Sequence, residues 1–232
     1  LGLPGLLSTL ALSEYNKGLE IYGPKGIKQK MKELLNTFNF EDKYSITVKE
    51  VGKGDFFENE DFILSAFPLS HGIRGNGYSF LRKGKTRIDK KQLEKSGLPE
   101  GPLLGKILQG KDVSFKGKKY SAKKLTYTEQ DKKISIIMDT LFNKNLVLPV
   151  KNSNLLICES SFSSEIEQKA KEHLHLTAKQ AGKIAKKSGS KKLLLTHISQ
   201  RFEKDLKSLL RDAKQEFKNT ELVKDFDSFS IS

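Results

Sequence analysis

Residues 134–139 read Ile-Ser-Ile-Ile-Met-Asp, an apolar run that ends in a carboxylate. Two later stretches have the same form: Leu155–Glu159 is Leu-Leu-Ile-Cys-Glu, and Leu193–His197 is Leu-Leu-Leu-Thr-His. Continuous apolar runs of this length are typical of strands buried on both faces of a sheet. Helical patterns lie between and after these runs, so this part of the chain predicts an α/β arrangement.

Capping signals place the helices between these strands. Ser164 with Glu167 has the spacing of a capping box and predicts a helix to about residue 172. Thr177 with Gln180 predicts a second helix, which Gly189 should end. A third helix is expected over 206–217, where leucines recur on one face, and a last strand over 222–231.

The N-terminal half predicts shorter elements. Helices are expected over Leu3–Ser13 and from Pro24 onward, where Ile27, Met31, Leu34, Leu35 and Phe38 recur at helical spacing. Strands are expected over Leu19–Tyr22, Tyr44–Val51, Phe62–Phe67 and Tyr78–Leu81.

Composition favours a folded chain with an anionic partner. The 232 residues are 36% hydrophobic, enough to bury a core, and carry a formal net charge of +14. Nucleic acid and a genome-wide bias toward lysine explain that charge equally well. No apolar run of transmembrane length occurs, so no membrane partner is expected. Cys158 is the single cysteine, which excludes an internal disulfide and predicts a reducing, cytoplasmic location, with Cys158 in the core.

The positive charge is concentrated in one segment. Residues 82–128 hold 14 Lys and Arg residues against four Asp and Glu residues, a net charge of +10. Uniform codon bias does not produce such a concentration. The segment is either a surface for nucleic acid or a disordered charged insertion.

Several metal-competent residues follow predicted strands. His71 comes a short turn after 62–67, Asp139 and Glu159 end their runs, and His197 ends the third. Ligands bind at this edge of α/β sheets, and Zn2+ binds imidazole and carboxylate groups. We therefore take His71, Asp139 and His197 as candidate metal ligands. The alternative is that such residues cap helices or bind backbone amides, and no His-x-His or His-Glu-x-x-His motif supports the metal site by itself.

An ordered set of motifs resembles the ribonuclease Z family across nearly the whole chain. The matching segments are Leu1–Leu7, Leu19–Ile27, His71 with Gly75–Tyr78, Gly101–Lys106, Asp139-Thr140, Glu159–Phe162, His175–Thr177 and Thr196–Phe202. Each motif alone is weak, but their order and spacing together are specific.

The resemblance implies a fold, a reaction and a site. The fold is the αβ/βα sandwich of the metallo-β-lactamase superfamily. The reaction is cleavage of precursor tRNA after the discriminator base, with two Zn2+ ions that activate a hydroxide. By resemblance, His71 and His197 each bind an ion and Asp139 bridges both. His175 is the catalytic residue that assists proton transfer or stabilises the developing charge of the phosphate, with the catalytic Glu159 orienting it, and Arg201 lies close to the site. His173 matches no motif and is expected to be a solvated helix-end residue.

The resemblance also assigns a role to the basic segment. Residues 82–128 stand where the family has a protruding arm that clamps the tRNA away from the cleavage point. Gly101 and Pro102 resemble its tip, and Lys106 of the same motif is a further expected substrate contact. The family forms homodimers in which one subunit's arm serves the other's site, so a homodimer is expected.

One departure affects the predicted activity. The family's His-x-His-x-Asp-His motif, which supplies metal ligands, is absent from the sequence, which begins with Leu1. We therefore expect a sandwich incomplete on its N-terminal side and a chain inactive alone. Two other functions stay open: a phosphodiesterase of the same fold that acts on small esters, and a non-catalytic RNA-binding fragment.

Overall fold

The computed structural model describes residues 2–37 and 43–231, so Leu1 of the first motif and Phe38 of the second predicted helix lie outside the described residues. The chain forms two compact units. The first comprises residues 1–58, 63–80 and 133–232, and the second comprises 59–62 and 81–132.

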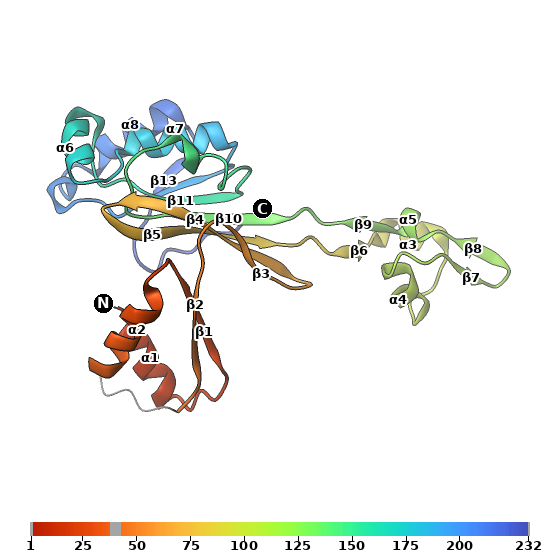
Figure 1. Ribbon diagram of the computed structural model, residues 1–232. Coiled ribbons are helices and arrows are strands. Elements are labelled where there is room, and N and C mark those ends of the chain that lie inside the picture. The colour runs from red at the N-terminus through yellow and green to blue at the C-terminus, as the bar shows by residue number, and fades with distance from the viewer. Residues whose placement is uncertain (1, 38–42, 232) are drawn as a thin grey trace. The chain divides into compact units, whose positions relative to one another are not determined.

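A seven-stranded mixed sheet forms the centre of the first unit, with strand order β13-β12-β11-β10-β5-β4-β3 (Figure 1). The strands are β3 (Gly54–Glu58), β4 (Phe62–His71), β5 (Ile73–Arg82), β10 (Lys132–Ile137), β11 (Leu155–Glu159), β12 (Leu193–Thr196) and β13 (Thr220–Leu222). Strands β10 to β13 pair in parallel, and β3 pairs with β4 antiparallel; the three predicted apolar runs form β10, β11 and β12.

Helices cover one face of this sheet. They are α6 (Glu167–Glu172), α7 (Ala178–Ser188) and α8 (Leu206–Glu216), with 3-10 turns over Lys144–Leu146, Ser164–Ile166 and Gln200–Phe202 (Figure 1). The core between the helices and the sheet includes Ile137, Leu156, Ile184, Leu195 and Leu209, all fully buried. Successive side chains of β10 point to opposite faces of the sheet. Ile137 therefore faces this core, while Ile134 and Ile136 line an apolar hollow with Tyr78.

The N-terminal elements form a second, smaller layer. They are α1 (Gly2–Leu12), β1 (Leu19–Gly23), α2 (Ile27–Thr37) and β2 (Ile46–Glu50), and β1 pairs with β2 in parallel. The rings of Tyr22 of β1 and Phe56 are 4.6 Å apart and tilted by 38°, and the Tyr78 hydroxyl donates to the Tyr22 carbonyl oxygen at 3.1 Å. The large sheet therefore has α6, α7 and α8 on one face, and β1 of the small sheet contacts it through Phe56 and Tyr78 on the other, as expected for an αβ/βα sandwich.

The second unit has a core of its own. It contains β6 (Thr86–Ile88), α3 (Lys90–Ser96), α4 (Leu103–Leu108), β7 (Val113–Phe115), β8 (Lys118–Tyr120), α5 (Ala122–Leu125) and β9 (Thr126–Thr128). Leu93, Ile107, Tyr120 and Leu125 are buried together in it. The basic segment 82–128 falls within this unit, and its packed core contradicts the alternative of a disordered insertion.

Three expected features differ in the structure. Strand β4 continues to His71, which is therefore a strand residue and does not follow a turn. Ser164 does not cap a helix, because its hydroxyl and amide both donate to Asp212. The predicted strand 222–231 is wrong beyond Leu222, because a turn closed by Asp227, which accepts from the Lys224 amide at 2.9 Å, interrupts it.

Two predicted helix ends are confirmed. Thr177 and Gln180 form a reciprocal capping box at α7, and Gly189 ends that helix in the left-handed conformation. No helix within 2–37 or 43–231 has the length and apolarity needed to cross a membrane.

Candidate metal centre

Strand ends bring the polar residues together. His71 ends β4, Asp139 follows β10, Glu159 ends β11, and His197 follows β12. Because β11 and β12 run parallel with Glu159 opposite Thr196, these ends meet at one edge of the sheet. The fifth residue, His175, comes from the turn that precedes α7.

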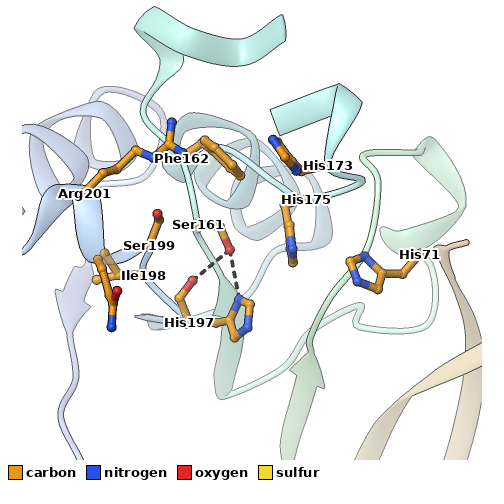
Figure 2. A pocket seen from close by; sticks show the side chains of 10 residues that line it. His71, Ser161, Phe162, His173, His175, His197, Ile198, Ser199 and Arg201 are labelled. Atoms are coloured by element: carbon orange, nitrogen blue, oxygen red, sulfur yellow. Dashed lines mark hydrogen bonds between the residues drawn. The ribbon is translucent and has the colours of Figure 1, made fainter. Parts of the chain in front are cut away.

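A cavity of about 510 Å³ opens at this edge (Figure 2). Its lining residues are His71, Ser161, Phe162, His173, His175, His197, Ile198, Ser199, Gln200 and Arg201. The histidine rings form a row in which the centroids of His71 and His175 are 4.6 Å apart and those of His175 and His197 are 5.2 Å apart.

Asp139, His175 and His197 form the tightest donor group. One ligand atom from each lies within 4.8 Å of the others. His197 Nε2 is 3.3 Å from Asp139 Oδ1, yet that oxygen is buried and has no hydrogen bond in the described part of the chain. A buried carboxylate oxygen without a donor costs free energy unless a cation or proton satisfies it.

Glu159 orients His175. Its carboxylate is fully buried and accepts from the Thr140 amide at 2.7 Å and the Ser161 hydroxyl at 2.9 Å. His175 Nδ1 lies 3.1 Å from both carboxylate oxygens. A carboxylate can only accept, so Nδ1 donates, and in the neutral ring Nε2 keeps its lone pair.

His71 and His197 are also held through Nδ1. His71 Nδ1 donates to the Leu174 carbonyl oxygen at 3.0 Å, and His197 Nδ1 lies 2.9 Å from the Ser161 hydroxyl oxygen. His197 has a φ of 52°, a left-handed conformation that is uncommon outside glycine. Such strain is often found where a functional side chain must point in one direction.

These donors suit a divalent cation. Three imidazole rings with fixed Nδ1 atoms can each present Nε2, and Asp139 adds an oxygen that lacks a partner. Nitrogen and carboxylate donors with hydrogen bonds behind them are the usual surroundings of zinc and related ions. Of the predicted ligands, the structure brings Asp139 and His197 together. His71 lies beside His175, so that the His175 ring stands between His71 and His197 in the row.

The remaining predicted residues are dispersed. Arg201 lines the cavity, with its guanidinium carbon 5.1 Å from the centre of the Phe162 ring. Gly101 and Pro102 precede α4, Lys106 lies within it, and all three are exposed residues of the second unit. Cys158 is fully buried in the core, and burial raises the pKa of its thiol, so it is no nucleophile.

Six lining residues were not predicted as site residues: Ser161, Phe162, His173, Ile198, Ser199 and Gln200. All of them except His173 lie inside matching motifs, which could have indicated them. His173 is exposed at the end of α6, as predicted, but it also lines the cavity and stacks on Phe162. No sequence signal distinguishes it from an ordinary helix-end residue.

No protein-family model matches the chain. Sequence relatives do: a ribonuclease Z of Archaeoglobus fulgidus is 32% identical over 237 residues, which cover 100% of this chain and 76% of the relative. The chain belongs to the ribonuclease Z family. A ribonuclease Z of Listeria monocytogenes is 35% identical and covers 99% of this chain and 76% of the relative.

Solved structures agree on the fold. The short form of human tRNase Z matches with a TM-score of 0.64 at 24% identity, covering 100% of this chain and 74% of that one. The Bacillus subtilis protein YhfI, described as a metallo-β-lactamase fold protein, matches with a TM-score of 0.62 at 16% identity, covering 96% and 68%. The predicted fold is thereby confirmed for this ribonuclease Z family member.

Proposed function

We infer that this chain serves the cleavage of precursor tRNA at its 3′ end, as a metal-dependent endoribonuclease. The observation that carries the inference is the convergence of Asp139, His175 and His197 at the sheet edge of a ribonuclease Z family chain. The donor set suits hydrolysis, and the buried Cys158 offers no alternative nucleophile.

We propose Zn2+ as the ion, held by Asp139 and His197 with His71 as a further ligand. When bound, such an ion lowers the pKa of a coordinated water and neutralises the attacked phosphate. Asp139 and His197 belong to the close donor group of the described residues, and His71 or His175 would complete three ligands for one ion. The family's second ion would need further donors.

The proposed proton-transfer group is His175. Its Nδ1–H is directed at the Glu159 carboxylate, so Nε2 faces the reacting groups and can give a proton to the departing oxygen or take one from water. The negative charge of Glu159 stabilises the imidazolium that forms during the transfer. The geometry also allows His175 Nε2 to act as a ligand, since it lies in the close donor group.

The second unit is proposed to hold the tRNA through phosphate contacts. Its basic segment carries a net charge of +10, and lysines that contact phosphates give salt-sensitive binding that follows RNA shape and not sequence. Gly101, Pro102 and Lys106 are the proposed contact tip. We propose a homodimer in which this unit serves the partner's site.

The proposed metal site is tested with His197→Ala in the full-length protein. Zinc content and precursor-tRNA cleavage should both fall, while the control Lys187→Ala, an exposed residue of α7, leaves both unchanged. Equal zinc content in wild type and His197→Ala would reject the site. A wild-type protein that binds RNA but never cleaves it would favour the hypothesis of a non-catalytic RNA-binding fragment.

The substrate is tested with a combined Lys106→Ala, Lys111→Ala and Lys119→Ala variant. All three residues are exposed in the second unit. Cleavage of precursor tRNA should fall and its salt dependence should weaken, while hydrolysis of a small chromogenic phosphodiester persists. Unchanged tRNA cleavage would contradict the proposed phosphate contacts of this unit. A wild-type protein that hydrolyses the small ester but not precursor tRNA would favour the small-ester phosphodiesterase.

Mixing variants tests the homodimer. Subunits with His197→Ala lack the site, and subunits with the three lysine substitutions lack the clamp. Activity restored in a mixture supports a clamp that acts on the partner's site. Two inactive variants that stay inactive after subunit exchange contradict it.

A further inference from the structure

Three planar side chains stand in a row along one wall of the cavity. The guanidinium carbon of Arg201 lies 5.1 Å from the centre of the Phe162 ring. The rings of Phe162 and His173 are 5.9 Å apart with an angle of 12° between their planes, so they are stacked. Figure 2 shows Phe162 between Arg201 and His173, with His175 and His197 beneath them.

The backbone fixes this row. Phe162 is 4% exposed, its amide donates to the Leu176 carbonyl oxygen, and its own carbonyl accepts from Ala178 at 2.9 Å. Because the two segments joined by these hydrogen bonds are both packed in the protein, the Phe162 ring has little freedom to move. It can therefore support the side chains on either side of it.

A reversal of the chain turns His173 toward the cavity. The His173 amide donates to the Lys169 carbonyl oxygen, which ends α6, and Leu174 follows with a left-handed φ of 59°. The His175 amide then donates to the Ala170 carbonyl oxygen at 2.9 Å. As a result His173 and His175, two positions apart, both line the same cavity.

The chemistry of the row suits a nucleobase. Phe162 is buried and cannot contact a ligand with its ring face, but His173 is exposed at the end of the row. Single-stranded RNA is commonly recognised by stacking of unpaired bases on aromatic rings and guanidinium planes. An exposed imidazole backed by a fixed aromatic ring presents such a plane next to the proposed reaction site.

We propose that His173 is the stacking surface for one nucleobase beside the scissile phosphate, and that Phe162 and Arg201 hold its ring in place. The proposal rests on the proposed function for the nature of the substrate. It assigns to His173 a substrate contact that the family motifs do not contain. The chemical class of its ligand is an unpaired base, and the contact requires no particular base identity.

The test uses an acceptor-stem RNA hairpin with a short 3′ trailer, in EDTA so that no cleavage occurs. A 2-aminopurine base is placed on either side of the cleavage position. The wild type and His173→Phe should quench one of these two probes, and His173→Ala should not. Affinity for the hairpin should fall roughly 5- to 150-fold in His173→Ala, the range of one lost base stack.

An abasic nucleotide at the responding position provides a matched control for the base. It should weaken binding to the wild type by a similar factor and should not weaken His173→Ala further. Glu172→Ala, the exposed neighbour on α6, should bind like the wild type. Equal abasic penalties in wild type and His173→Ala, or quenching that survives in His173→Ala, would overturn the proposal.

The two proposals fail in different ways. If the proposed function is wrong, the wild type shows no metal-dependent cleavage in the protein as its gene encodes it. If only the stacking role is wrong, cleavage persists while neither probe responds to His173.

Discussion

Glu159→Ala should destabilise the first unit strongly, because three donors share this one carboxylate. The Thr140 amide, the Ser161 hydroxyl and the His175 Nδ1–H all point at it, and the carboxylate is fully buried. Removing a buried charged partner costs about 3–5 kcal/mol, and each stranded buried donor costs about 1–3 kcal/mol. Water entering the vacated space offsets part of the second cost, so we expect a loss of about 3–5 kcal/mol in the free energy of unfolding.

Glu159→Gln separates charge from shape. The amide keeps the side-chain volume and one accepting oxygen, but its nitrogen donates where another donor already points. We expect a loss of about 1–3 kcal/mol, smaller than for alanine. The exposed residue Glu165 supplies the control, since Glu165→Ala should stay within about 0.5 kcal/mol of the wild type.

Urea titration provides the assay, with amide exchange at β11 reporting on the first unit alone. With an m-value near 3 kcal/mol/M, the midpoint of Glu159→Ala should fall by roughly 1–2 M. The affinity of the protein for Zn2+ should also fall about 10- to 100-fold, because Glu159 holds the Ser161 hydroxyl, which lies 2.9 Å from Nδ1 of the proposed ligand His197, and orients His175 of the close donor group. A midpoint for Glu159→Ala that matches the Glu165→Ala control would refute the argument that this carboxylate organises the site.

Three further predictions concern other parts of the first unit. Asp139→Asn should weaken Zn2+ binding about tenfold or more, measured by calorimetry, since Oδ1 is a buried acceptor without a donor; an unchanged affinity would remove Asp139 from the site. Gly182→Ala should lower stability by about 1–3 kcal/mol in thermal unfolding, because the added Cβ would lie 2.7 Å from the Ala213 carbonyl oxygen, whereas Gly5→Ala, with open space around it, should not destabilise. Burial raises the pKa of the Cys158 thiol, so the folded chain holds a proton that the unfolded chain releases above about pH 8.5. The free energy of unfolding should therefore fall with rising pH above that value, by up to about 1.4 kcal/mol per pH unit, and it should fall less steeply in Cys158→Ala.

The order of strands and helices in the C-terminal half could be predicted because local patterns determine it. Apolar runs at 134–138, 155–158 and 193–195 became β10, β11 and β12, and Thr177 began α7 through its capping box. Short strands were harder to predict from the sequence. Strand β3 was not predicted, since its pairing with β4 depends on a neighbour that no local pattern reveals.

The candidate site divides in the same way. Asp139, Glu159 and His197 could be placed at strand ends from the sequence, since each directly follows an apolar run. That they share one sheet edge follows from the parallel pairing of β10 to β12, which only the tertiary structure establishes.

Other features depend entirely on the folded chain. The alignment of His173 on Phe162 results from a left-handed Leu174, and the hydrogen-bond partner of His71 is a carbonyl oxygen more than a hundred positions away in the sequence. The sequence by itself determined which side chains were available, because strand and helix signals act over a few neighbouring residues. Which of these side chains meet was decided by long-range pairing and packing, because a ring nitrogen finds its partner only after distant segments have come together.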